Sequence, residues 1–334
     1  MTGRRTNLAL AALSGLAVAS GAAAFGAGAG SSRWVTGIHG AIGMSLVLLT
    51  PSKVRIARQG MGRHQGDRAT SVTLSVLVVL ALVTGLAHSS GIGGEVGGLR
   101  ALHVHVAASL VALPLLVWHM RARPARPRRA DLSRRSVLES AGLLGASALA
   151  YGVLEGALRL GRLPGARRRG TGSYEAGSFA PPEMPVTQWL NDEVSLVDPS
   201  GWQLSVTAGG QQRTWSLGEL DLGDQVTAVL DCTGGWYASQ VWEGARLDRL
   251  LAPVGAARSI VVRSLSGYVR RFPVADLQHL LLATRVGGKP LSPGHGFPAR
   301  LVAPARRGFW WVKWVKSIEL DSRPWWLQSP FPLD

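Results

Sequence analysis

Cysteine is nearly absent from this chain of 334 residues, which contains one, Cys232. A single cysteine excludes an intrachain disulfide and any zinc or iron–sulfur site that needs several thiolates. Carboxylates are also few, because 20 Asp and Glu residues stand against 36 Lys and Arg, a net charge of +16. The arginines occur in short blocks beside apolar stretches, which favours a membrane protein over one that binds nucleic acid. A lone cysteine is by default a small buried hydrophobe, so a chemical role for Cys232 depends on the residues around it.

Residues 1–158 are rich in Ala, Leu, Val and Gly, and they contain five apolar stretches that could each span a bilayer as a helix of about 20 residues. These stretches run approximately over Leu8–Gly28, Trp34–Thr50, Thr70–His88, Leu102–Met120 and Val137–Leu158. The second is the shortest and the fifth the least apolar, so the pattern permits four spans or five. We expect residues 1–158 to form an all-α transmembrane bundle of about five helices.

Basic residues are concentrated in alternate connections between these stretches. The rich connections contain Arg4 and Arg5; Lys53, Arg55, Arg58, Arg63 and Arg68; and Arg121, Arg123, Arg126, Arg128, Arg129, Arg134 and Arg135. The other two connections contain Arg33 and Arg100. Since basic connections stay in the cytoplasm, five spans place the N-terminus there and residues after about 160 on the outer, periplasmic or extracytoplasmic, face. The pattern predicts a multi-pass protein of the cell membrane, surrounded by membrane lipid.

Histidines within the apolar stretches indicate a cofactor, because ionisable residues inside a membrane are costly and usually face a functional interior. His39 and His105 lie near the outer ends of two stretches that run in the same direction. Two imidazoles on neighbouring helices can be the axial ligands of a b-type haem. His119 follows His105 by about four helical turns on nearly the same face, which permits a second haem. The alternative is that these are interfacial histidines at helix ends, as we expect for His88 and His103. A helical core with paired histidines is similar to membrane cytochromes b.

The remainder of the chain has a different pattern. Residues 159–184 are rich in Gly, Arg and Pro, and we expect them to form a linker. From residue 185 to 334, short β-rich runs alternate with turn residues and short helical pieces, which predicts an α+β domain with a mixed sheet. The expected strands are Gln203–Thr207, Gln225–Leu230, Ser259–Arg263, Tyr268–Pro273, Ala299–Val302 and Ser317–Leu320. The expected helical pieces are Leu217–Leu220, Leu247–Leu251 and Val274–Leu281.

Two segments of this domain, about sixty residues apart, carry the chemical signal: Asp231–Trp236, which contains Cys232, and His295–Pro304. Other segments accompany them in a fixed order: Trp202–Val206, Trp242–Leu247, Ser266–Tyr268, Gly288–Leu291 and Lys313–Val315. Together they resemble the molybdopterin-dependent oxidoreductase domain of the sulfite oxidase family, over about Trp189 to Leu320. The resemblance implies the sulfite oxidase-type fold and a molybdenum centre, of which Cys232 is the thiolate ligand and a catalytic residue.

The resemblance also implies roles for other residues of the domain. Glycines beside the cysteine would let the backbone approach the pterin closely, and its phosphate needs hydrogen-bond donors and positive charge. The expected cofactor-binding residues are Asp231, Thr233, Gly234, Gly235, His295, Gly296, Arg300 and Lys313. Tyr237 and Arg270 are the expected catalytic residues that contact a small oxyanion or S-oxide substrate. For Arg300 and Lys313, surface solvation or a local salt bridge remains the alternative.

The segment Ser133–Leu138, just before the fifth apolar stretch, resembles a twin-arginine export signal. It lies inside the chain, and Val137 replaces the phenylalanine that is most often found there. A domain that receives its pterin in the cytoplasm must cross the membrane folded, which makes the twin-arginine translocase the expected partner. Alternatively, Arg134 and Arg135 belong only to the basic flank of the span.

These observations predict a membrane-anchored molybdopterin oxidoreductase that exchanges electrons with the quinone pool through haem b. The chain ends soon after the last family segment, so we expect the compact form that resembles periplasmic methionine sulfoxide reductase, fused to a cytochrome b-like bundle. Reduction of an S-oxide or N-oxide and oxidation of sulfite both remain open. Two alternatives remain: a molybdenum enzyme with a plain membrane anchor and a separate electron carrier, and a non-catalytic binding module of the same fold.

Overall fold

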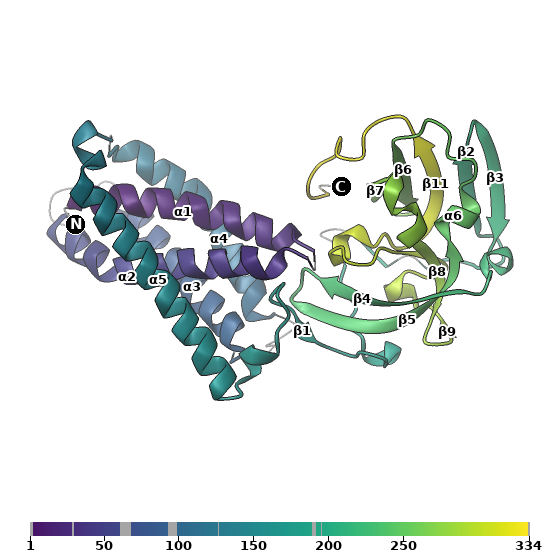
Figure 1. Cartoon of the computed structure of the whole chain (residues 1–334), viewed down its shortest axis with the longest axis horizontal. Coiled ribbons are helices and arrows are strands. Elements are labelled where there is room, and N and C mark those ends of the chain that lie inside the picture. The colour runs from purple at the N-terminus through teal and green to yellow at the C-terminus, as the bar shows by residue number, and fades with distance from the viewer. Residues whose placement is uncertain are drawn as a thin grey trace. The chain divides into compact units, whose positions relative to one another are not determined.

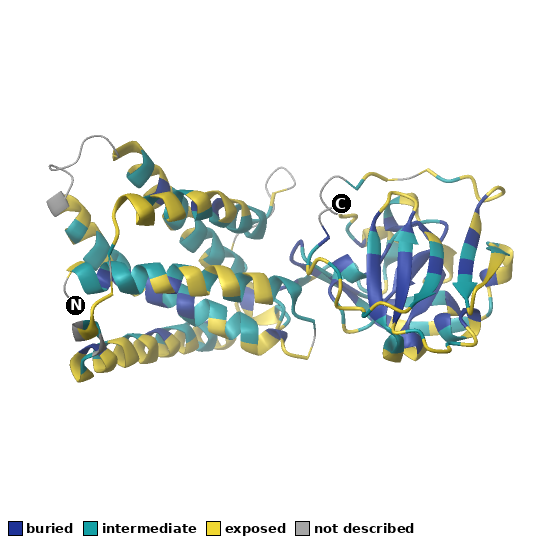
Figure 2. Ribbon diagram, turned by 90° about the horizontal axis from the view of Figure 1, so that it is seen from above, coloured by how far each residue is buried: buried dark blue, intermediate teal, exposed yellow. Residues whose placement is uncertain are grey.

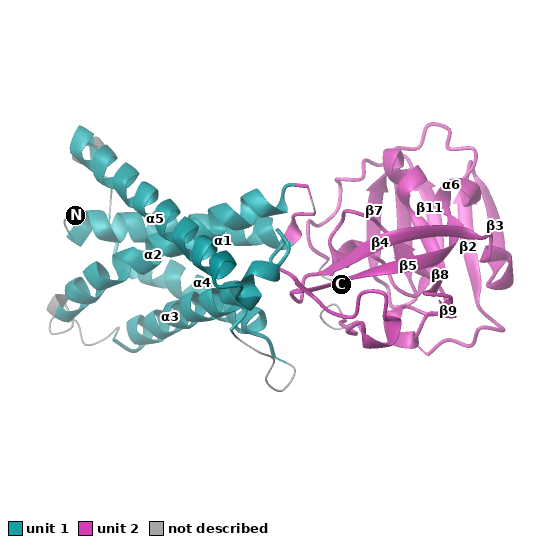
Figure 3. Cartoon of the chain, turned by 60° about the horizontal axis from the view of Figure 1, so that its bottom comes forward, with its two compact units in different colours: residues 1–25, 31–172 teal, residues 26–30, 173–334 magenta. Residues whose placement is uncertain are grey.

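The computed structural model describes residues 3–28, 30–60, 68–92, 99–125, 127–188, 192–194 and 196–332. The chain divides into two compact units, one of residues 1–25 and 31–172 and the other of residues 26–30 and 173–334 (Figure 3). The division after Gly172 falls inside the segment 159–184, which the sequence predicts as a linker. Arg63, Arg126 and Trp189, which entered the sequence predictions, lie outside the described residues.

The described part of the first unit contains five helices that are long and apolar enough to cross a membrane (Figure 1). They are α1 (Gly3–Gly26), α2 (Ser32–Gly60), α3 (Arg68–Ser90), α4 (Ala101–Ala122) and α5 (Arg134–Leu160). The prediction of an all-α bundle of about five helices is confirmed. Helix α2 extends beyond the apolar stretch Trp34–Thr50: it includes Pro51 and the basic residues that follow it.

Small and polar residues hold these helices together. Ser45 of α2 donates a hydrogen bond of 2.8 Å to Ser147 of α5, and both are fully buried. The ring of Tyr151 in α5 lies so close to Gly40 of α2 that a Cβ there would come within 2.3 Å of it. Most other apolar side chains of the unit are at least partly exposed (Figure 2). Close backbone approach at small residues, with apolar side chains outside, is typical of helices that pack within a bilayer.

The residues after α5 are folded against the end of α3. The Arg168 guanidinium pairs with Glu155 of α5 and donates a hydrogen bond of 2.8 Å to the Ser89 carbonyl oxygen of α3. A Cβ on Gly165 would come within 2.4 Å of the same oxygen, so glycine is required for this approach. The first part of the expected linker is therefore an ordered part of the helical unit.

The second unit contains two β-sheets in its described residues (Figure 1). The six-stranded sheet consists of β1 (Tyr174–Glu175), β4 (Asp224–Cys232), β5 (Trp236–Arg246), β8 (Leu281–Val286), β9 (Lys289–Pro290) and β10 (Arg300–Val302). The five-stranded sheet consists of β2 (Gln203–Ala208), β3 (Gln211–Ser216), β6 (Ser259–Ser264), β7 (Val269–Pro273) and β11 (Val315–Asp321). Short helical segments, including α6 (Leu247–Leu250), connect the strands. One apolar core draws residues from both sheets, including Leu204, Trp242 and Leu282.

Parallel and antiparallel pairs occur in both sheets. The pairs β1–β5 and β2–β11 are parallel, whereas β4–β5 and β6–β7 are antiparallel. This confirms the α+β class with mixed strand pairing, although two sheets are present where one was expected. The strand prediction missed β3, β5 and β8, and also the two-residue strands β1 and β9. In β5 the buried positions alternate as Trp236, Ala238, Gln240 and Trp242, and Ala and Gln give little strand signal on their own.

Candidate functional site

Cys232 lies at the tip of a tight hairpin, where β4 ends and β5 begins. It pairs in register with Trp236, and three residues form the loop between them. The amide of Gly234 donates to Cys232 Sγ at 3.3 Å, and the amide of Gly235 donates to the Cys232 carbonyl oxygen at 3.2 Å. Gly235 has a φ of +84°, which favours glycine. The loop therefore holds the sulfur by backbone groups and leaves its outer side accessible.

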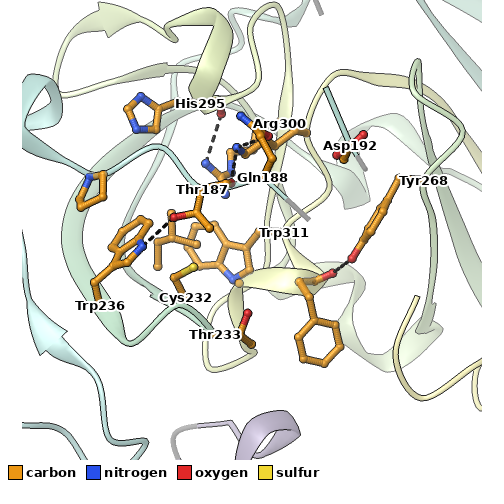
Figure 4. Close-up of a pocket in the computed structure, with 15 residues that line it drawn as sticks. Thr187, Gln188, Asp192, Cys232, Thr233, Trp236, Tyr268, His295, Arg300 and Trp311 are labelled. Atoms are coloured by element: carbon orange, nitrogen blue, oxygen red, sulfur yellow. Dashed lines mark hydrogen bonds between the residues drawn. The ribbon is translucent and has the colours of Figure 1, made fainter. Parts of the chain in front are cut away.

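The Cys232 side chain faces a pocket whose described lining comes from distant parts of the second unit (Figure 4). In this view the sulfur lies between the rings of Trp236 and Trp311, with Arg300 and His295 above it. The described lining residues are Pro185, Thr187, Gln188, Asp192, Leu230, Cys232, Thr233, Trp236, Tyr268, His295, Arg300, Gly308, Phe309, Trp311 and Lys313. The pocket thus combines one soft thiol with a cationic side and an aromatic wall.

Arg300 is the most deeply buried cation of this pocket, with 2% of its surface exposed. Its guanidinium lies 5.5 Å from the Trp242 ring and 5.6 Å from the Trp311 ring, and it donates to the His295 carbonyl oxygen at 3.2 Å. Within the described residues its Nε atom has no hydrogen-bond partner. Burial lowers the pKa of Arg300 to about 10. A buried guanidinium with a free donor and no carboxylate among these contacts is suited to bind an anion.

Lys313 lies beside Arg300 and uses its ammonium group to hold neighbouring segments. Its Nζ donates to the carbonyl oxygens of Gly294 and Thr187 at 2.6 and 2.9 Å, and to Gln188 Oε1 at 3.1 Å. Burial and the neighbouring Arg300 lower the pKa of Lys313 from its ordinary value of 10.5 to about 7. Its charge therefore changes within the physiological pH range.

His295 contributes a neutral imidazole to the same side of the pocket. Its Nδ1 lies 2.8 Å from Ser292 Oγ, and its Nε2 lies 3.1 Å from the Met184 carbonyl oxygen. Burial, followed by the charges of Arg300 and Lys313, lowers the pKa of His295 to about 4. At neutral pH the imidazole is uncharged, so it can accept or donate a hydrogen bond but adds no positive charge.

Comparison with known proteins identifies the second unit. Residues 191–327 match the family model described as the oxidoreductase molybdopterin binding domain. This region is a molybdopterin-binding oxidoreductase domain of the sulfite oxidase family.

Relatives of the molybdopterin domain extend over parts of larger proteins. Mitochondrial sulfite oxidase of Rattus norvegicus is 29% identical over 167 residues, which cover 39% of this chain and 31% of the rat protein. The uncharacterized oxidoreductase YuiH of Bacillus subtilis (strain 168) is 30% identical over 96 residues, 27% of this chain and 48% of that protein. The sulfane dehydrogenase SoxCD from Paracoccus pantotrophus aligns in structure with 22% identity and a TM-score of 0.36, over 39% of this chain and 40% of that one. This chain thus spans about a third of the rat enzyme.

The residues of the pocket fit a molybdenum cofactor. Cys232 offers a thiol, and Arg300 offers a buried donor that no protein group satisfies among the described residues. Gly308 brings the backbone close, because a Cβ there would lie 3.1 Å from the Cys232 Cα atom. Gly296, with a φ of +106°, lets Arg300 and Lys313 approach each other, since a Cβ would meet both side chains at 3.2 Å. These residues would hold the metal and the anionic end of the pterin.

The structure brings five of the sequence-predicted site residues to the pocket lining, namely Cys232, Thr233, His295, Arg300 and Lys313. Gly234, Gly235 and Gly296 shape the adjoining backbone. Asp231 lies behind Cys232, where it pairs with Arg307.

The two predicted catalytic residues other than Cys232 are placed differently, because neither belongs to the described lining of the pocket. Arg270 is buried in β7, where its guanidinium lies 4.1 Å from the Trp310 ring and donates to the Ser329 carbonyl oxygen. Tyr237 pairs with Glu175 in β1 and, as the residue after the buried Trp236, alternates to the other face of β5. The pocket lining gives no support for contact between either residue and the substrate. Such contact remains a prediction.

Sequence reasoning missed several residues of the pocket. Gln188 and Asp192 come from an irregular segment with no motif, so only the fold places them near Cys232. Tyr268, which the sequence analysis gave no role, lies in the pocket wall, where its hydroxyl donates to the Phe309 carbonyl oxygen.

In the first unit, His39 of α2 and His105 of α4 lie next to each other. Their ring centroids are 6.0 Å apart and the ring planes are inclined by 79°. His39 Nδ1 lies 3.0 Å from Ser20 Oγ of α1, and His105 Nδ1 lies 2.7 Å from the Ala81 carbonyl oxygen of α3. Because Nδ1 of each ring is engaged, Nε2 is the nitrogen that a metal would take.

The two rings meet edge to face. Glycines of the neighbouring helices make room for both rings. A Cβ on Gly21 would lie 3.1 Å from His39 Cε1, and a Cβ on Gly85 would lie 3.0 Å from His105 Nδ1.

The other histidines of the first unit have different neighbours. His119 Nδ1 lies 3.4 Å from Ser71 Oγ of α3. His103 Nδ1 accepts from the Arg100 amide at 3.3 Å and caps the start of α4. These contacts give no support for a second metal at His119, which remains a prediction.

The depressed pKa of Lys313 predicts that binding of an anionic pterin depends on pH. Below about pH 7 the lysine of the cofactor-free protein is charged, and above it the lysine becomes neutral. We therefore expect the affinity for the cofactor to be level below pH 7 and to fall by up to about tenfold per pH unit above it. Anaerobic titration of cofactor-free protein with extracted molybdopterin, from pH 6 to pH 9, measures this dependence.

Replacement of the same lysine provides a matched control. The pKa of Lys313 also predicts that stability rises with pH over the range in which cofactor affinity falls. In Lys313→Met the affinity for the cofactor should be lower throughout and should lose most of its decline above pH 7. An unchanged decline would contradict the role of Lys313.

Since the folded-state pKa of Lys313 lies below the ordinary value, the unfolded chain binds more protons between about pH 7 and 10.5. Stability of the cofactor-free protein should therefore rise over that interval, and less so in the variant.

Proposed function

We propose that this chain is a membrane-anchored, molybdopterin-dependent oxidoreductase that transfers an oxygen atom to or from a small substrate at Cys232. The observation that carries the proposal is the buried cationic side of the pocket next to the lone thiol. Arg300 is buried and Lys313 half-buried, which costs free energy, and the groups that accept their hydrogen bonds are neutral. A pterin phosphate bound there would supply the missing negative charge, with the metal end at Cys232.

The pocket favours an uncharged S-oxide or N-oxide over sulfite. Once Arg300 and Lys313 serve the cofactor, the remaining described lining includes the Thr233 hydroxyl and the carboxylate of Asp192. The hydroxyl can donate to the oxygen of a neutral oxide, whereas the carboxylate repels an anion such as sulfite. We therefore infer that the enzyme is of the sulfoxide reductase type, acting in the reductive direction, and that it is not a sulfite dehydrogenase.

We further propose that electrons come from quinol through a b-type haem held by His39 and His105. The fixed Nδ1 contacts and the 6.0 Å ring separation support this assignment. When bound, a molybdenum cofactor supplies two-electron oxygen-atom transfer and a haem supplies one-electron transfer. Ser20 and Ala81 would orient the two imidazoles, and the apolar surroundings would exclude water from them.

The five spans and the arrangement of basic residues support a cell-membrane location, with the N-terminus in the cytoplasm and the molybdopterin domain on the outer face. Export of a folded domain by the twin-arginine translocase, through Ser133–Leu138, belongs to the same proposal. In the structure Ser133 is the N-cap of α5, and its hydroxyl accepts from the Ser136 amide. This cap is equally compatible with an ordinary helix start, so the export route depends on experiment.

Elemental analysis of the detergent-purified protein tests the proposal, with expression in a host that makes molybdopterin. We expect close to one molybdenum per chain and at least one iron. Molybdenum without iron would contradict the haem relay and favour a plain anchor with a separate carrier. Absence of both metals would favour a non-catalytic binding module.

Two turnover assays then test the substrate class. One measures reduction of S-oxides or N-oxides by a reduced dye, and the other measures oxidation of sulfite by an acceptor dye. Faster sulfite oxidation would contradict the reductive assignment.

A further inference from the structure

A buried ion pair lies directly behind Cys232, outside the pocket lining. The side chains of Asp231 and Arg307 are 8% and 3% exposed, and Arg307 Nη1 donates to Asp231 Oδ1. Ser173 is fully buried and joins them, since its hydroxyl donates to Asp231 Oδ1 at 2.7 Å and accepts from Arg307 Nη1 at 3.3 Å. The other end of the guanidinium, Nη2, donates to the Cys232 carbonyl oxygen at 3.1 Å.

Three separate segments therefore meet at the hairpin loop that contains Cys232. Arg307 forms a parallel bridge with Asp231 and precedes Gly308, whose Cα is so close to Cys232 that a Cβ would lie 3.1 Å from the Cys232 Cα. Ser173 precedes β1, and the amide of the next residue, Tyr174, donates to the Gly235 carbonyl oxygen at 3.0 Å. The loop is thus held at both of its ends, by Arg307 at Cys232 and by β1 at Gly235.

This ion pair is better explained by geometry than by stability. A buried ion pair loses the solvation of both charges, and apolar replacements of similar size are often equally stable. The planar guanidinium, however, has donors in a fixed fork. It can therefore bind Asp231 with one nitrogen and the Cys232 carbonyl with the other at a set distance. The Cys232 carbonyl also accepts from the Gly235 amide, so two donors fix the peptide plane that follows the cysteine.

We propose that Arg307, held by Asp231 and Ser173, is a positioning residue that fixes the direction of the Cys232 sulfur for metal ligation. The inference rests on the proposed function in one respect, that Cys232 is a metal ligand. Arg307 touches neither the pocket nor its occupant, and it acts through the Cys232 carbonyl and the loop. Removal of the guanidinium, with its contacts to Asp231 and to the Cys232 carbonyl, should leave the domain folded but let the sulfur point in more than one direction.

Alkylation of Cys232 tests this without any cofactor. Because Cys232 is the only cysteine of the chain, incorporation of iodoacetamide into the native, molybdenum-free full-length protein reports this one sulfur. We expect Arg307→Lys to react at least five times faster than the parent, since a lysine cannot bridge Asp231 and the carbonyl. Arg263→Lys is the matched control, because Arg263 pairs with Glu319 in the other sheet at 2.6 Å and should leave the rate unchanged.

The loaded protein gives a second, independent readout. In Arg307→Lys we expect molybdenum content to fall at least threefold and the Mo(V) electron paramagnetic resonance spectrum to broaden or shift, with Arg263→Lys matching the parent in both. Should Arg307→Lys fail to fold, the double variant Arg307→Met/Asp231→Leu removes both charges together and takes its place. Parent-like alkylation and a parent-like spectrum in the folded variant would overturn the inference. A parent protein without molybdenum would contradict the proposed function, while the alkylation rates would still decide the role of Arg307.

Discussion

Replacement of Cys232 by serine is expected to abolish oxygen-atom transfer, with a loss of at least about a thousandfold in turnover, or about 4 kcal/mol of transition-state stabilisation. A hydroxyl has nearly the shape of the thiol but is a much harder and less acidic ligand, so it cannot replace a soft thiolate at the metal. The pocket offers no substitute, because Cys232 is the only cysteine of the chain. Dye-coupled turnover of an S-oxide by the purified full-length variant measures the loss.

The control for this substitution is Thr227→Ser, an equally conservative change on an exposed position of the same strand, β4. It should leave turnover and molybdenum content unchanged. Cys232→Ser should retain the pterin in part, because Arg300 and Lys313 are intact and bind its phosphate end. If Cys232→Ser keeps an activity close to that of the parent, thiolate ligation is contradicted. If the parent has no measurable activity for the substitution to remove, the non-catalytic alternative is supported.

Substitution of either His39 or His105 by alanine is expected to remove the haem, with iron per chain falling from one to near zero. Quinol-driven turnover should fall at least about a hundredfold, because the proposed haem would lose one of the two histidines that would hold it. Dye-driven turnover should stay at the parent level, since the dye delivers electrons to the other unit directly. Iron analysis, the haem absorption spectrum and the two assays measure these effects in the same preparation.

His103→Ala provides the matched control for this prediction. His103 lies on the same helix, two residues from His105, and its ring caps the helix start at the Arg100 amide. We expect it to keep its iron and its quinol activity. Retention of iron in both His39→Ala and His105→Ala would rule out these two histidines as the residues that hold the haem. Loss of quinol activity without loss of iron would instead point to a defect in quinol binding.

Several features of the site were predictable because they depend on local chemistry. The glycines after the lone cysteine were expected to allow a close approach of the backbone, and Gly235, with a φ of +84°, lies in the tight loop that follows Cys232. The segment that contains His295 and Arg300 predicted a group of donors, and both lie in the pocket wall with Cys232. Long apolar stretches predicted the five helices, because a helix satisfies its own backbone in lipid.

Other features depend on the fold, and no local sequence pattern predicts them. Arg270 and Arg307 are both arginines with apolar or aromatic neighbours in sequence, yet one is stacked on Trp310 and the other supports Cys232. Their roles differ because β7 belongs to the five-stranded sheet, whereas Arg307 bridges to Asp231 beside β4. Gln188 reaches the pocket with the help of Lys313, more than a hundred residues later, which donates hydrogen bonds to Thr187 and Gln188.

The sequence by itself determined five helices that are long and apolar enough to cross a membrane, the α+β character of residues 185–334 and the single thiol of the chain. Each of these follows from short-range properties, namely the length of an apolar run, the period of a strand and the rarity of cysteine. The tertiary structure alone decided that Arg307 contacts the Cys232 carbonyl from behind, and that Ser20 and Ala81 engage the Nδ1 atoms of His39 and His105. These are contacts between segments far apart in the chain, and their partners are selected by packing and burial, which no local pattern records.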